Sequence, residues 1–208
     1  MDVFHCLPLF YSACARVCAR NSNGGHYEKY LSGMVFAAAM ALPMTNATAQ
    51  EMIPFGTDHD VEYAALLWDV MNASNLAGPN AIQTYPYEGI APHGMMLQTF
   101  YSTGTIDGHT GDLIVKRNYG PEGVTEDQVL MDPDKHLGAI TVMFRREAGY
   151  DDDDDNWFWA KYLPDGSLDK NAMGGQLAGR VAKGMDEGCI ACHSGEDDYV
   201  FTSNAIGN

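Results

Sequence analysis

The sequence predicts a single α+β domain, built mainly from antiparallel β-sheet, over residues 50–208. Three observations lead to this prediction. One helical segment opens the domain, four runs rich in β-branched and aromatic residues follow it, and a short helix with two cysteines lies near the chain end. The links between successive runs are short, which favours antiparallel pairing over crossover connections.

Residues 1–49 precede this domain and are typical of a secretory signal behind an over-extended start. An apolar stretch at 31–42 follows Lys29, and Ala47-Thr48-Ala49 matches the small-residue pattern after which signal peptidase cuts. The stretch is shorter than the roughly 20 residues that span a membrane. The alternatives are a retained anchor or a buried helix. We expect cleavage near Ala49, export to the periplasm, and loss of the three leader cysteines, Cys6, Cys14 and Cys18.

The first element of the domain is a helix that begins at Thr57 or Asp58 and runs to about Asn72. Either of the first two residues can cap the helix N-terminus. The residues expected on one buried face are Val61, Ala65, Leu66, Trp68 and Met71. The chain over 75–92 is rich in Gly, Pro, Asn and Tyr, which predicts an irregular connection.

Four strands are expected next, each bounded by Gly, Pro or Asp, at 95–101, 112–119, 138–146 and 157–163. In the last strand, Trp157 and Trp159 share one face, while Phe158 and Tyr162 share the other. Core packing is the default interpretation of these aromatics; the alternative is a core on one side of the sheet and a contact with a prosthetic group or a second subunit on the other.

The cysteines of the domain indicate its chemistry. After residue 50 only Cys189 and Cys192 remain, and His193 follows directly. Two cysteines are too few for a four-cysteine zinc site, and a thioredoxin-like pair would come early in a βαβ unit. In C-x-x-C-H, both thiols bond to haem and the histidine ligates the iron. We expect one covalently bound haem c, held by Cys189, Cys192 and His193 on a short C-terminal helix.

Charge and layout exclude several classes of protein. The net charge is −16, which disfavours nucleic acid and anionic lipid as partners and suits a cationic redox partner or a small neutral or cationic substrate. No methionine follows Met185, which excludes the electron carriers whose motif is N-terminal and whose methionine ligand lies downstream. The helical gas-binding cytochromes need four long amphipathic helices, which the sequence does not predict.

The order of motifs resembles the cytochrome P-460 family, which includes the β-sheet cytochromes c′. Besides the haem motif, the similar segments over residues 93–202 are Gly111-Asp112-Leu113-Ile114-Val115-Lys116, Ala139-Ile140-Thr141-Val142-Met143, Gly149-Tyr150, Trp157-Phe158-Trp159-Ala160-Lys161-Tyr162, Pro164-Asp165-Gly166 and Asp198-Tyr199-Val200-Phe201-Thr202. The resemblance implies a sheet-based homodimer with five-coordinate haem. It also implies one of two functions: oxidation of hydroxylamine, or binding of nitric oxide or carbon monoxide without turnover.

Lys116 matches the strand lysine that catalytic members of this family join to the haem edge. Alternation places it on one face with Ile114 and Asn118; the alternative is a lysine that faces solvent. The distal carboxylate of the catalytic members has no counterpart that we can identify in the sequence. The leading hypothesis is an oxidoreductase acting on hydroxylamine or a related small nitrogen compound. Gas binding and simple periplasmic electron transfer are the alternatives.

Two further features each have two interpretations. His93 is either a hydrogen-bonded structural histidine, which we favour, or a sixth iron ligand suited to electron transfer. The five consecutive aspartates at 151–155 offer oxygen ligands for calcium but lack the glycine and glutamate of an EF-hand. For this run we expect a solvated hairpin loop.

Overall fold

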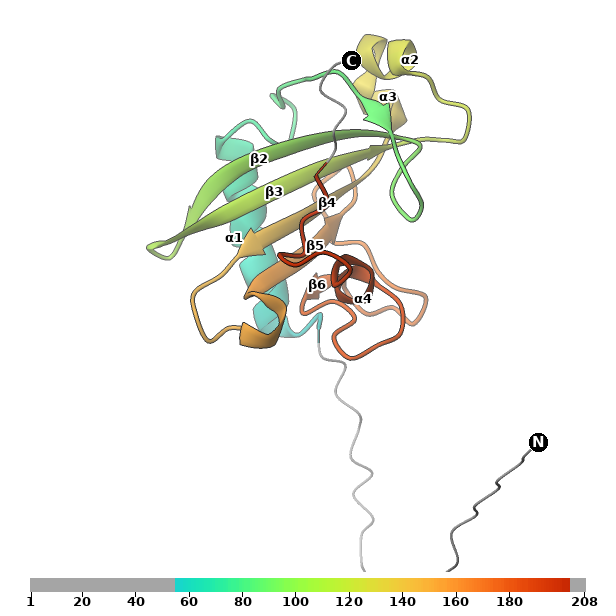
Figure 1. The fold of residues 1–208 in the computed structure, drawn as a ribbon. Helices are drawn as coiled ribbons and strands as arrows, with labels where there is room; N and C mark the ends of the chain where they lie inside the picture. The colour runs from blue at the N-terminus through green and yellow to red at the C-terminus, as the bar shows by residue number, and fades with distance from the viewer. Residues whose placement is uncertain (1–54, 203–208) are drawn as a thin grey trace, which may run out of the picture. The chain divides into compact units, whose positions relative to one another are not determined.

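The computed structural model describes residues 55–202 as a six-stranded antiparallel sheet with four helices (Figure 1). The strands lie side by side in chain order, from β1 to β6. This confirms the α+β class and the predicted antiparallel meander. The described residues belong to one compact unit, Ala49–Asn208, and none of their helices is long and apolar enough to cross a membrane. The predicted signal at 1–49, with its three cysteines, lies outside them.

Helix α1, Asp58–Ala73, covers one face of the sheet (Figure 1). It begins at the predicted cap: the Thr57 hydroxyl accepts from the Asp60 N–H, and the Asp60 carboxylate accepts from the Thr57 N–H. The predicted buried face is wrong by about one residue, because Ala65 and Leu66 are exposed. Apolar residues occur on several sides of this helix, so the pattern did not define one face. The apolar residues that are buried are Tyr63, Ala64, Leu67 and Met71.

The central hairpin is longer than predicted. Strands β2, Met96–Ile106, and β3, His109–Tyr119, are joined by a two-residue turn. Asp107 and Gly108 in that turn have φ of +49° and +81°, the combination for which Asp-Gly is preferred in tight hairpins. Strands β4, Leu137–Arg145, and β5, Trp157–Tyr162, match their predicted bounds to within one residue.

Several short elements were not predicted: β1, Tyr87–Glu88; α2, Glu126–Met131; α3, Pro133–His136; the 3₁₀ turn η1, Asp152–Asp154; and β6, Ala178–Gly179. A two-residue strand has no periodicity from which it can be recognised. Helix α2 does carry a local signal, because Thr125 and Gln128 form a capping box at its start.

The sheet separates the two largest clusters of buried side chains. Phe158 and Tyr162 of β5 lie in the larger core, against α1. Trp157 and Trp159 lie in a second cluster on the opposite face, with Ile190 of helix α4, Cys189–His193. This confirms the predicted alternation along β5. We call the second side the motif face, because the helix with the cysteine motif packs on it.

Candidate haem-binding site

Helix α4 consists of the motif itself and is held on the motif face by the first of the two residues between the cysteines. The Ile190 side chain is 5% exposed and packs in the cluster of Trp157 and Trp159. The Ile190 N–H donates to the carbonyl of Val181 at 3.4 Å. Cys189 is half-buried, Cys192 is exposed, and both are free thiols. One buried isoleucine therefore anchors the helix, and neither cysteine of the helix is in a disulfide.

The turn into α4 depends on a glycine. Gly188 has φ +126°, a conformation that side chains rarely adopt, and a Cβ there would lie 2.3 Å from the Cβ of Ala182. Glycine alone allows the backbone to pass this close while it takes this conformation. Gly188 thus sets where the motif helix begins.

The imidazole of His193 has a defined orientation and a defined tautomer. Its Nδ1 lies 2.7 Å from the carbonyl oxygen of Tyr199; since a carbonyl only accepts, Nδ1 carries the hydrogen and Nε2 carries the lone pair. The rings of Trp159 and Phe201 flank it, with centroids at 4.8 and 5.2 Å. Burial lowers the pKa of His193. The ring is therefore held in the neutral form that binds metals through Nε2.

The thiols do not have the environment of a redox dithiol. Burial raises the pKa of Cys189 to about 11, whereas the reactive cysteine of a thioredoxin-like pair has a lowered pKa. This difference and the position of the motif near the chain end both argue against a role in disulfide exchange.

Lys116 lies on the motif face, as its spacing predicts. The strand register places Thr99, Lys116, Thr141 and Lys161 in one row across β2 to β5. Lys161 pairs with Asp169 at 2.8 Å, but no carboxylate among the described residues pairs with Lys116. Burial lowers the pKa of Lys116, and its charge lowers the pKa of both His93 and His193. The Lys116 charge therefore acts on the motif histidine, and it has no ionic partner within the described part of the chain.

His93 lies in the loop between β1 and β2 and faces His193. Its Nδ1 is 3.2 Å from Oδ1 of Asn118 and 3.5 Å from Oγ1 of Thr141, which confirms the expected hydrogen bonding. The two imidazole centroids are 6.2 Å apart and the ring planes are at 87°. A hollow of about 300 Å³ borders His93, Asn118 and Thr141. The two histidines are far apart in the sequence, and their approach was raised there only by the alternative in which His93 is a sixth iron ligand.

The acidic run at 151–155 is the expected hairpin loop, but it is only partly solvated: Asp152 and Asp153 are exposed, and two of the other aspartates are not. It connects β4 to β5, and Asp151 and Asp154 are buried. The Lys183 ammonium pairs with Asp151 and lies 3.2 Å from the Asp154 carboxylate, and Arg180 Nε lies 3.7 Å from Asp151. Lysine and arginine thus balance these carboxylates. Within residues 55–202, no group of three or more His, Cys, Asp or Glu side chains is arranged to bind a metal ion.

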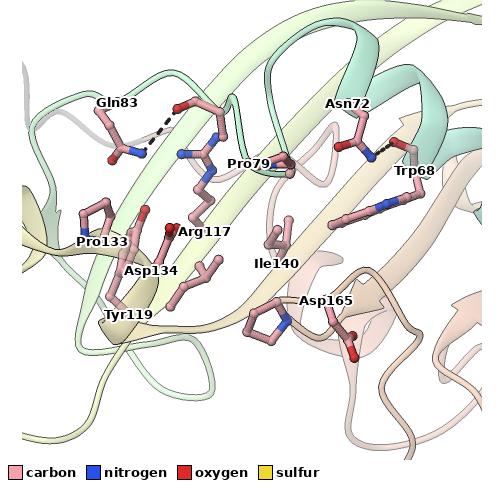
Figure 2. A pocket seen from close by; sticks show the side chains of 14 residues that line it. Trp68, Asn72, Pro79, Gln83, Arg117, Tyr119, Pro133, Asp134, Ile140 and Asp165 are labelled. Atoms are coloured by element: carbon pink, nitrogen blue, oxygen red, sulfur yellow. Dashed lines mark hydrogen bonds between the residues drawn. The ribbon is translucent and has the colours of Figure 1, made fainter.

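A second hollow, larger than the one beside His93, lies on the other face of the sheet. It has a volume of about 510 Å³, and Figure 2 shows Arg117 among the residues that line it. Arg117 is 2% exposed and donates to the carbonyls of Leu76 and Ile82 at 2.7 and 2.8 Å. These bonds hold the connection before β1 against β3. No cysteine or histidine lines this hollow, so it offers no ligand of the C-x-x-C-H type.

The donor set on the motif face fits a covalently attached haem. Two unpaired thiols and an imidazole with a free Nε2 lie on one short helix. Beside them, the indole N–H of Trp159 is buried without a hydrogen-bond partner among the described residues. A buried donor in this state costs free energy unless another group binds it. Comparison of the chain with protein-family models, with curated proteins and with solved structures gave no match.

Proposed function

We propose that this chain is an exported mono-haem c-type cytochrome, in which Cys189 and Cys192 bind the haem and His193 ligates its iron. The single observation that carries the proposal is the state of His193. Its Nδ1–H donates to Tyr199, so that Nε2 is left as the ligand atom on the same short helix as both thiols. Haem supplies an iron that changes oxidation state, tuned by its axial ligands and its surroundings.

At this haem we propose first the oxidation of hydroxylamine or a related small nitrogen compound. Lys116 supports this reaction, because it matches the family's haem-linked lysine and lies half-buried on the motif face. Burial lowers its pKa, which increases the fraction of neutral amine, the form that makes covalent bonds. A cationic redox partner agrees with the net charge of −16; a homodimer is proposed from the resemblance alone.

Periplasmic electron transfer is the second candidate, and His93 is the observation that favours it. Oxidation of hydroxylamine, like the binding of nitric oxide or carbon monoxide, needs an exchangeable position on the iron opposite His193. The His93 ring lies 6.2 Å from the His193 ring, on the motif face. A histidine on each side of the iron is the arrangement expected of an electron carrier rather than of an open site.

The haem proposal is tested by making the protein in a bacterium that matures c-type cytochromes in its periplasm. We expect a red protein whose intact mass has gained one haem, and a Cys189→Ala, Cys192→Ala double variant that has gained none. A colourless wild-type protein without the added mass would contradict the proposal.

The reaction is tested on the same preparation. Wild-type protein should oxidise hydroxylamine in the presence of a small-molecule electron acceptor. Lys116→Leu should lose this activity and show a different absorption spectrum, while Lys170→Leu, at an exposed lysine, should retain both. If Lys116→Leu leaves spectrum and activity unchanged, the lysine has no part in the chemistry, and electron transfer is the better proposal.

A further inference from the structure

The two histidines on the motif face are at the separation of a ligand pair. Two imidazoles that bind one metal ion from opposite sides, each through a nitrogen at about 2 Å, have ring centroids about 6 Å apart. The centroids of His93 and His193 are 6.2 Å apart, with planes at 87°. At this separation both imidazoles could ligate the iron of a haem bound between them.

The two rings also share a tautomer that leaves the same nitrogen, Nε2, without a hydrogen. The amide N–H groups of Asn118 donate to the carbonyls of Lys116 and Ala139, so its Oδ1 is the atom that faces His93. Because Oδ1 only accepts, Nδ1 of His93 carries the hydrogen and Nε2 carries the lone pair. His193 has the same tautomer, set by the Tyr199 carbonyl. Neither Nε2 has a hydrogen-bond partner among the described residues.

The position of His93 is fixed by its neighbours in the chain. Gly94 lies so close to β3 that a Cβ there would be 2.5 Å from both the N and the O of Tyr119. The Met95 N–H donates to the Tyr119 carbonyl at 2.8 Å. The loop is therefore pinned to the end of β3 directly after His93, and Asn118 on the same strand holds the ring. A side chain that is ordered in advance loses little entropy when it binds a ligand.

We infer that His93 is the second axial ligand of the iron, opposite His193, so that the resting haem is six-coordinate. The inference rests on the proposed function, since it requires haem at Cys189 and Cys192. It has a direct consequence for that function. Nitric oxide, carbon monoxide or hydroxylamine can bind the iron only when His93 leaves it, and so His93 limits access to the site.

The inference is tested by electron paramagnetic resonance and absorption spectra of the purified ferric protein, together with carbon monoxide binding to the ferrous form. Wild-type haem should be low-spin. His93→Ala should be high-spin, return to low-spin when imidazole is added, and bind carbon monoxide on the order of tenfold faster or more, because the competent state is no longer a minor one. The matched control is His136→Ala, which removes a half-buried histidine that bonds to the Gly120 carbonyl; it should behave as wild type.

Two outcomes would overturn the inference while leaving the haem proposal intact. One is a wild-type protein that carries covalent haem and is already high-spin, with no change in His93→Ala. The other is a low-spin haem that becomes high-spin in Lys116→Leu but not in His93→Ala, which would identify the lysine as the ligand. A protein without covalent haem would instead refute the proposed function itself.

Discussion

His193 and Tyr199 are joined by a hydrogen bond of 2.7 Å from the imidazole Nδ1 to a main-chain carbonyl. Tyr199 can offer this carbonyl because the chain turns back over the motif face with Tyr199 at φ +63°. Two bonds hold the returning segment: the indole N–H of Trp157 donates to the Asp198 carbonyl at 3.0 Å, and the Tyr199 hydroxyl donates to Asp154 at 2.8 Å. The residues after the motif thus orient the ligand within it.

Removing the Tyr199 hydroxyl should weaken this segment without removing the carbonyl. We expect Tyr199→Phe to lower the free energy of unfolding by about 1 kcal/mol, the value of one partly buried hydrogen bond. The iron of the variant should also bind added imidazole more readily, because His193 is less well oriented. Urea unfolding and imidazole titration measure the two effects. Tyr85→Phe, at a tyrosine 78% exposed, is the control and should change neither; an unaltered Tyr199→Phe would show that the hydroxyl does not support the segment.

The cluster around Lys183 should contribute more to stability than any exposed ion pair. The Asp151 side chain is 3% exposed and faces both Lys183 and Arg180. Asp151→Asn leaves two cations without this partner in a partly buried setting, so we expect a loss of about 2–4 kcal/mol. Asp153→Asn changes a side chain 92% exposed in the same loop, and its effect should stay within about 0.5 kcal/mol. Equal losses in the two variants, measured by thermal or urea unfolding, would contradict a buried cluster.

Calcium should not affect this loop. Lys183 already lies against Asp151, Asp153 and Asp154, and a cation in that position competes with a metal ion for the same oxygens. We therefore expect the melting temperature to be the same with calcium and with a chelator. A rise in melting temperature on adding calcium, lost in Asp154→Asn, would show instead that the run binds the ion.

The features that the sequence predicted correctly are those with a local signal. The Thr57 cap, the alternation of Trp157 and Phe158, and the motif helix each depend on residues a few positions apart. The approach of His93 to His193, and the burial of Asp151 against Lys183, depend instead on how the sheet brings distant segments together. Five aspartates in a row are expected to lie in solvent. No residue near them in the chain indicates that Lys183, about thirty residues later, will pair with them.

The two cysteines of the motif should differ in reactivity before haem is attached. Burial raises the pKa of Cys189 to about 11, and the thiolate is the form that reacts with iodoacetamide. In haem-free protein at pH 8 the Cys189 thiol is therefore mostly protonated. Its alkylation should be slow and should accelerate as the pH rises toward 11, while exposed Cys192 reacts first. Mass spectrometry of digested samples measures both rates; in urea they should converge, and equal rates in the folded protein would contradict the burial of Cys189.

Among the glycines near the motif, Gly188 should be the one whose substitution by alanine lowers stability most. An alanine there has to adopt φ +126° and place its Cβ 2.3 Å from that of Ala182, so the helix start must shift. We expect Gly188→Ala to cost about 2–4 kcal/mol of stability and to reduce the fraction of protein that carries haem. Gly184→Ala is the matched control, because Gly184 has φ +70° with no atom within 4 Å of the added carbon; strain alone should cost about 1 kcal/mol. If both variants unfold at the same urea concentration and incorporate haem equally, the close contact with Ala182 does not set the start of the motif helix.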